Sequence, residues 1–328
     1  MTIAVTGATG YLGSHMLLSL HDRGVDAVGV AESGTLPPAL LNHVLLSILS
    51  SADVQGLATV FETHDVTGVI HFAGNDATPA GSLIDPMAQY DQILTPTLTA
   101  LRAATLRGIE HFVFSSTASV YGVPQRMPIR EETPLSPISP FGAAMGMAER
   151  IVADVCRPAC IGTAILRYFN VAGADPNARA GETGHPRHLI KAAAQIATGV
   201  LNEPLKIYGN DYNTPDGTCI RDYIHVSDMA EAHATALDHL MAGGGSVTLN
   251  CGYGRGISVH EVIAAVQRVT GKTLPTQYAA RRQGDAPLLI ADTAAIRTAL
   301  SWVPRYDDID VIIRSAIQWE EQSRVRAA

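Results

Sequence analysis

Short apolar runs alternate along the first half of the chain with longer segments whose apolar residues recur at helical spacing. The apolar runs lie at 3–5, 27–31, 68–74, 111–116 and 165–170, and a blurred one over 36–51 predicts a strand ending near 48–50. Residues 85–107 and 140–156 have helical periodicity. This alternation predicts an α/β fold, a doubly wound parallel sheet with helices on both faces.

The pattern loosens in the second half, where Gly, Pro, Asn and Asp cluster at 173–186 and 209–217. We therefore predict two domains, 1–170 and 171–328, with some strands interleaved between them. The second domain is expected to be smaller and to lie over the carboxyl ends of the strands, where parallel sheets bind ligands.

A glycine-rich turn, Val5-Thr6-Gly7-Ala8-Thr9-Gly10-Tyr11-Leu12-Gly13, joins the first strand to the first helix. Gly7 permits the tight turn, Gly10 allows backbone to approach a pyrophosphate, and Gly13 allows close packing of helix on strand. The free N–H groups of the helix then face the anion. At this position the motif predicts a dinucleotide-binding Rossmann fold.

Composition and charge exclude several classes of protein. A net charge of −8 without a basic run argues against nucleic acid as a partner. No apolar run reaches the roughly 20 residues of a membrane span, and the first residues do not resemble an export signal. Four cysteines without metal-type spacing are typical of reduced thiols, so we expect a cytoplasmic protein without a metal site.

Several motifs together resemble one family. They are the glycine turn, Val69-Ile70-His71-Phe72-Ala73-Gly74, Phe114-Ser115-Ser116-Thr117, Leu166-Arg167-Tyr168-Phe169-Asn170, Tyr208-Gly209-Asn210-Asp211-Tyr212, Arg221-Asp222-Tyr223 and Arg281-Arg282-Gln283-Gly284-Asp285. Over nearly its whole length the chain resembles the extended short-chain dehydrogenase/reductases, most closely the UDP-glucose (UDP-galactose) 4-epimerases. The resemblance implies NAD as cofactor, a UDP-sugar as substrate and inversion of sugar C4 through a 4-keto intermediate.

The family's acid–base pair is a Tyr and a Lys four residues apart, preceded by a Ser or Thr on a strand. Thr117 matches the Ser/Thr, but Phe141 and Met145 stand at the Tyr and Lys positions. Their spacing places them on one helix face, as the chemistry requires. Phe has no hydroxyl and Met has no ammonium, so neither can accept or steer a proton. A substitute base would have to be Thr117, Tyr121, a water or a group of the substrate.

The resemblance also implies a cofactor site in residues 1–170. Its members are Gly7, Gly10, Tyr11, Leu12, Gly13, Glu32, Ser50, Ser51, Phe72, Ala73, Gly74, Ser115 and Tyr168. Glu32 is either a ligand of the adenosine ribose or a solvated loop charge, since Ala31 occupies the family's Asp position. Asp76 replaces a Lys and Thr95 an Asn. Each lost partner could cost about 1–3 kcal/mol, so we expect weaker NAD retention than in the family.

The nucleotide-sugar site implied by the resemblance, nearly all of it in residues 171–328, is better preserved. It comprises Asn170, His188, Leu189, Lys206, Tyr208, Arg221, Tyr223, Val259, Arg282, Asp285 and Leu289. Arg221 and Arg282 match diphosphate-binding arginines, whose planar forks suit phosphate oxygens. Leu289 matches a position where side-chain bulk limits an N-acetyl group.

Four hypotheses remain open from the sequence. The chain is a working 4-epimerase with another base, an engineered inactive form of one, a nucleotide-sugar-binding protein without redox catalysis, or a nucleotide-sugar dehydratase. The family's usual pairing through helices that correspond to 85–107 and 140–156 further predicts a homodimer.

Overall fold

The computed structural model describes residues 1–72, 74, 78–186 and 188–327. Among these residues, seven parallel strands form one sheet in the order β10-β6-β5-β4-β1-β2-β3. The strands are β1 (Thr2–Thr6), β2 (Asp26–Ala31), β3 (Leu45–Ile48), β4 (Val66–His71), β5 (His111–Thr117), β6 (Gly162–Tyr168) and β10 (Val247–Cys251). The predicted doubly wound α/β fold is confirmed.

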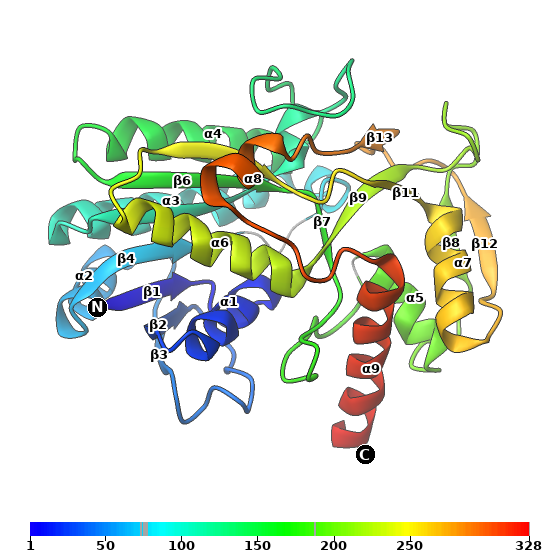
Figure 1. Ribbon diagram of the computed structural model, residues 1–328, viewed down its shortest axis with the longest axis horizontal. Helices are drawn as coiled ribbons and strands as arrows, with labels where there is room; N and C mark the ends of the chain where they lie inside the picture. Colours follow the sequence, from blue (N-terminus) through cyan, green and yellow to red (C-terminus); the bar gives the residue numbers. More distant parts are fainter. Residues whose placement is uncertain (73, 75–77, 187, 328) are drawn as a thin grey trace.

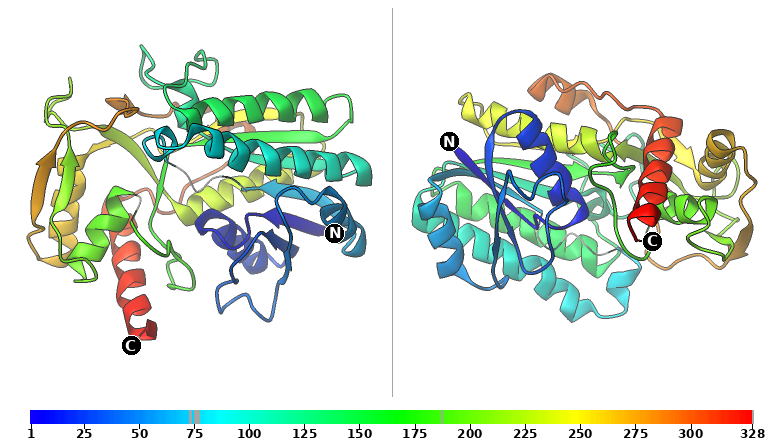
Figure 2. Two further views of the ribbon diagram at one scale, coloured as in Figure 1. Left: turned by 180° about the vertical axis from the view of Figure 1, so that it is seen from behind. Right: turned by 90° about the horizontal axis from the view of Figure 1, so that it is seen from below.

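Helices cover both faces of this sheet. Figure 1 shows α1 (Tyr11–Asp22) and α6 (Val226–Met241) on one face, and the view from behind in Figure 2 shows α3 (Pro86–Arg107) and α4 (Pro140–Cys156) on the other, beside α2 (Val54–Thr63). Leu17, Leu20 and Leu237 belong to the core of the first face, and Leu101 and Val152 to that of the second. Burial of such apolar side chains is the main stabilising term of the fold.

The two long helices begin and end where local chemistry sets their limits. The Asp85 and Ser139 side chains accept the Ala88 and Gly142 N–H groups, at 3.0 and 3.2 Å, and cap α3 and α4. Each helix has Pro at its first position, where a missing N–H costs nothing. Both predicted helices are thereby confirmed, and α4 places Phe141 in its first turn.

The sixth strand differs from its predicted range of 165–170. β6 ends at Tyr168, and Asn170–Ala172 form a separate strand, β7, which pairs with β9 (Ile220–His225). Phe169 lies between β6 and β7, and its N–H donates to the carbonyl of Cys251, the last residue of β10, at 3.1 Å. Asn170 thus belongs to the smaller half of the molecule.

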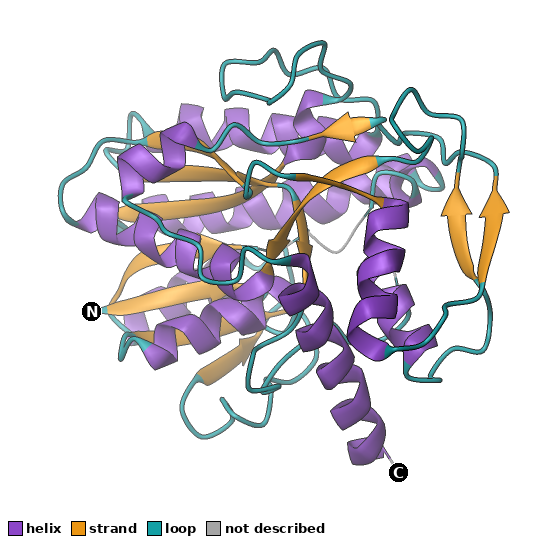
Figure 3. Ribbon diagram, turned by 45° about the vertical axis from the view of Figure 1, so that its right-hand side comes forward, coloured by secondary structure: helices purple, strands orange, loops and turns teal. Residues whose placement is uncertain are grey.

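The smaller half contains two further sheets and lies beside the carboxyl ends of the large one. β9 pairs with β7, with β11 (Gly256–Ser258) and with β13 (Leu288–Leu289), while β8 (Leu205–Tyr208) and β12 (Thr276–Ala279) form the ribbon at the far edge in Figure 3. Its helices are α5 (Leu189–Ala197), α7 (Val259–Thr270) and α9 (Ile309–Ala327), and α8 (Ala294–Leu300) contacts β10. The chain returns to the large sheet through α6 and β10.

Candidate functional site

A cavity of about 1570 Å³ lies between the carboxyl ends of the large sheet and the smaller half. From the predicted cofactor and catalytic sets it is lined by Gly7, Gly10, Tyr11, Leu12, Gly13, Glu32, Ser50, Ser51, Phe72, Gly74, Tyr168, Thr117 and Phe141. From the predicted nucleotide-sugar set it is lined by Asn170, His188, Leu189, Lys206, Tyr208, Arg221, Tyr223, Val259, Arg282, Asp285 and Leu289. Residues far apart in sequence therefore form one continuous site.

Three predicted residues need separate mention. Ser115 and Met145 do not line the cavity, because both lie in the interior, with 0% and 1% of their surface exposed. Ala73, together with the replaced position Asp76, lies outside the described residues. Thr95, which stands at the family's Asn position, lines the cavity.

The glycine turn has the geometry of a phosphate cradle. Gly7 has φ 71°, a left-handed conformation that favours glycine, and a Cβ at Gly13 would lie 2.1 Å from the Gly7 carbonyl oxygen. Gly10 is the N-cap of α1, with no side chain to occupy the helix N-terminus. A dinucleotide pyrophosphate fits this turn because the first N–H groups of an α-helix have no intrahelical partner and no side chain of Gly10 stands in front of them.

The adenosine end of the cavity is formed by the residues after β2 and β3. The Glu32 carboxylate accepts the Ser51 N–H at 2.9 Å while the residue stays exposed, so its role as a ribose ligand or as a solvated loop charge remains a prediction. This contact holds Glu32 beside Ser50 and Ser51 in the cavity wall. The arrangement leaves its second carboxylate oxygen to accept a ribose hydroxyl.

At the opposite end of the cofactor half, Thr117 closes β5 and Phe141 begins α4. The Thr117 hydroxyl accepts the Ser119 N–H at 3.2 Å, and the Phe141 N–H donates to the Ser82 hydroxyl at 3.2 Å. The Phe141 side chain is 4% exposed and contributes to the cavity wall, with Met145 one turn behind it. The wall therefore has a hydrocarbon ring without a hydroxyl at this position.

Tyr121 is excluded as a substitute base. Its ring is 1% exposed, and its hydroxyl donates to the Asn250 side chain at 2.7 Å and accepts from Arg167 at 2.9 Å. Burial raises the pKa of Tyr121 to about 12, and its side chain does not line the cavity. This phenol is part of the buried framework of the large domain.

Two arginines that were predicted to bind a diphosphate are held by neighbouring side chains. Arg221 lies 4.0 Å from the Asp285 carboxylate, and the Arg282 guanidinium stacks over the Tyr208 ring at 3.6 Å from its centroid. Burial raises the pKa of Asp285, and the charges of Arg221 and Arg282 oppose that shift. Burial also raises the pKa of Tyr223 to about 12, so its hydroxyl stays protonated.

Many lining residues were not predicted from sequence, and two groups of them belong to the smaller half of the molecule. One is the segment 173–186, whose Gly173, Glu182, Thr183, Gly184, His185 and Pro186 line the cavity. The other comprises Lys191 of α5 and Ala316, Trp319 and Glu320 of α9. The cluster of turn residues at 173–186 was the available signal for the first group, whereas nothing in the α9 sequence marks it as part of a site.

Among the described residues, no group of His, Cys, Asp and Glu has the arrangement of a metal site. A search of the same residues for a helix long and apolar enough to cross a membrane also found none.

Comparison with known proteins places this site in a family. Residues 3–252 match the model of the NAD dependent epimerase/dehydratase family. The chain is 47% identical over 320 residues to the UDP-glucose 4-epimerase of Azospirillum brasilense, covering 97% of this chain and 91% of the relative.

Solved structures of related proteins match the fold of this chain over nearly its whole length. UDP-glucose 4-epimerase from Bifidobacterium longum in complex with NAD+ and UDP is 34% identical, with a TM-score of 0.92 and 99% of each chain covered. The enzyme from Stenotrophomonas maltophila with bound NAD and formylated UDP-arabinopyranose is 33% identical, with a TM-score of 0.93 and 100% of each chain covered. The predicted family is therefore confirmed, and this chain belongs to the NAD-dependent epimerase/dehydratase family.

Proposed function

We propose that this chain holds NAD and a UDP-hexose in one cavity, as 4-epimerases do, and that Phe141 and Met145 leave inversion at C4 slow or absent. The observation that carries this proposal is a contrast within one cavity. The glycine turn and the two arginines have the geometry for a dinucleotide and a diphosphate, whereas the wall beside Thr117 has a phenyl ring.

Each part of the site has a role in this proposal. Bound NAD would supply the hydride acceptor for the sugar C4. The glycine turn binds its pyrophosphate, and Arg221 and Arg282 bind the sugar diphosphate with planar donor forks. Thr117 offers a hydroxyl to the sugar, and Phe141 excludes water without moving a proton. General acid–base catalysis contributes about 10²–10⁴-fold to such reactions, so its loss is the largest defect we infer.

A binding and turnover experiment tests the proposal. The purified chain is expected to release NAD on denaturation, to bind UDP by calorimetry and to convert UDP-galactose to UDP-glucose only at a trace rate. Arg282→Leu should weaken UDP binding roughly 10- to 100-fold, because a charge-assisted contact of about 1.5–3 kcal/mol is lost. Uridine binding should be unaffected, since it has no phosphate.

Arg255→Leu is the matched control, because Arg255 is exposed and does not line the cavity. Absence of affinity for every uridine diphosphate compound would contradict the binding half of the proposal. Rapid conversion by the unaltered chain would contradict the catalytic half.

We also propose a homodimer formed through the face that α3 and α4 share. Met87 of α3 and Met147 of α4 are 70% and 49% exposed, and a second chain packed on these two adjacent helices would bury both side chains. Light scattering should give the mass of two chains, and Met87→Lys with Met147→Glu should reduce it to one. A monomer at all concentrations of the unaltered chain would end this proposal.

A further inference from the structure

The segment 173–186, hereafter the strap, crosses from the cofactor half of the cavity to the nucleotide-sugar half. It follows β7 and precedes α5, and its residues line the cavity at both ends. The Tyr11 hydroxyl, next to the glycine turn, donates a hydrogen bond to the Gly173 carbonyl at 2.7 Å. Glu182 to Pro186 lie in the same wall as His188 and Leu189 of the predicted sugar site.

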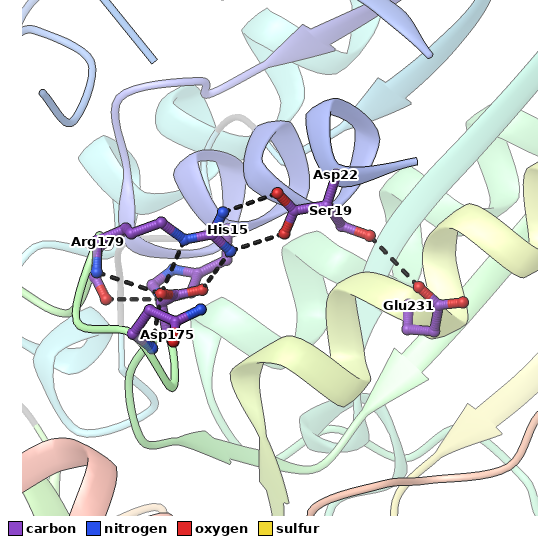
Figure 4. A network of polar contacts seen from close by, with 8 residues as sticks. His15, Ser19, Asp22, Asp175, Arg179 and Glu231 are labelled. Atoms are coloured by element: carbon purple, nitrogen blue, oxygen red, sulfur yellow. Dashed lines mark hydrogen bonds and ion pairs between the residues drawn. The ribbon is translucent and has the colours of Figure 1, made fainter. Parts of the chain in front are cut away.

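Charged and polar side chains fasten the strap to α1. The Arg179 guanidinium donates to both oxygens of Asp22, each at 2.7 Å, and to both oxygens of Asp175, at 3.0 and 2.7 Å. His15 lies between the carbonyls of Tyr11 and Ala180, with its ring nitrogens at 2.7 and 3.2 Å (Figure 4). Arg179 thus bridges the end of the cofactor-binding helix and the strap with a double fork.

The other end of the strap is fastened to α5 and α9. The Glu182 carbonyl accepts the Trp319 indole N–H at 2.9 Å and also the Lys191 ammonium, which pairs with Glu320 at 2.5 Å. Gly181 packs so closely on the indole that a Cβ there would lie 2.4 Å from it. These contacts fix the strap against the helices of the nucleotide-sugar half.

We propose that the strap couples the binding of NAD to that of the nucleotide sugar, with Arg179 as the positioning residue. This inference rests on the proposed function, because it requires both ligands in the cavity. Because the strap is held at both ends, a ligand that favours one placement of it also favours that placement for the other ligand, which gives positive cooperativity. The coupling passes through the Arg179–Asp22 fork because this contact joins the strap to the helix of the glycine turn.

The experiment first removes NAD from the full chain and then measures the affinity of the folded, NAD-free chain for UDP with and without saturating NAD. NAD should raise the affinity of the unaltered chain about fivefold or more, as a coupling between sites does. In Asp22→Asn, the ratio of the UDP affinity with NAD to that without NAD should be close to one, because an amide has one acceptor oxygen and cannot accept both Arg179 donors. Asp22 is 48% exposed, and Arg179 keeps Asp175, so the variant should fold.

Asp238→Asn is the matched control. Asp238 is 52% exposed and pairs at 2.8 Å with Arg23, the residue after Asp22, on the side of α6 rather than of the strap. The Asp238→Asn variant should retain the full ratio of UDP affinities with and without NAD. The Asp22→Glu variant should recover part of that ratio, because its carboxylate can still accept from Arg179. An unaltered chain without coupling, a full ratio in Asp22→Asn or an equal loss in Asp238→Asn would overturn the proposal. Failure to bind NAD or UDP at all would instead refute the proposed function.

Discussion

Replacing Phe141 by Tyr and Met145 by Lys together is expected to raise the rate of C4 inversion roughly 10²–10⁴-fold. The variant Phe141→Tyr adds a hydroxyl at the cavity wall beside Thr117, where Phe141 now presents its ring. A phenol buried there alone would keep a raised pKa and would remain a poor base. The ammonium introduced by Met145→Lys, one helical turn away, lowers that pKa, so both changes are required.

The measurement is conversion of UDP-galactose to UDP-glucose by the purified variants, normalised to the NAD they contain. Phe141→Tyr alone should give a small gain and Met145→Lys alone none, and Phe141→Leu is a control that changes packing without adding a donor. Met145 is 1% exposed, so the thermal stability of each variant must be measured beside its rate. A folded double variant that binds NAD and UDP but remains idle would show that the lost pair is not what limits turnover.

The framework of the site could be predicted because its signals are local. The glycine turn, the Pro that opens α4 and the four-residue spacing from Phe141 to Met145 each place residues within one or two helical turns. Parallel strands then bring their carboxyl ends together whatever the rest of the chain does. The binding residues of the nucleotide-sugar half were implied by the resemblance to the 4-epimerases and not by a local pattern, and they line the same cavity as the glycine turn.

The contacts that close the site could not be predicted. Lys191 and Glu320 are 129 positions apart, and Arg179 and Asp22 are 157 apart, so no local pattern links them. Long-range pairing of charged side chains depends on how α9 and the strap pack in the folded protein. Tyr121 shows the same limit, because its availability as a base depends on Asn250, 129 positions away.

The second large effect concerns stability: Glu149→Gln should lower the free energy of unfolding by about 3–5 kcal/mol. The Glu149 carboxylate of α4 accepts Arg167 Nε and Nη2, at 2.9 and 2.6 Å, and also the Ser116 hydroxyl. The Arg167 and Glu149 side chains are 8% and 6% exposed. The amide oxygen could still accept from Arg167, but the second acceptor and the counter-charge would be lost, which leaves the Arg167 charge buried with neutral partners that include Tyr121 and the Glu131 carbonyl.

A double-mutant cycle separates this charge effect from packing. Thermal or urea unfolding is measured for Glu149→Gln, Arg167→Met and the double variant that carries both changes, at constant NAD. The double variant should be more stable than either single variant, because it leaves no buried charge unpaired. Additive losses in the single and double variants would show that the pair contributes little beyond its volume.

The hydrogen-bonded network of Ser116, Glu149 and Arg167 joins β5, α4 and β6 behind Thr117 and Phe141. Since none of these three side chains lines the cavity, we expect weaker UDP binding only in those variants whose unfolding is detectable.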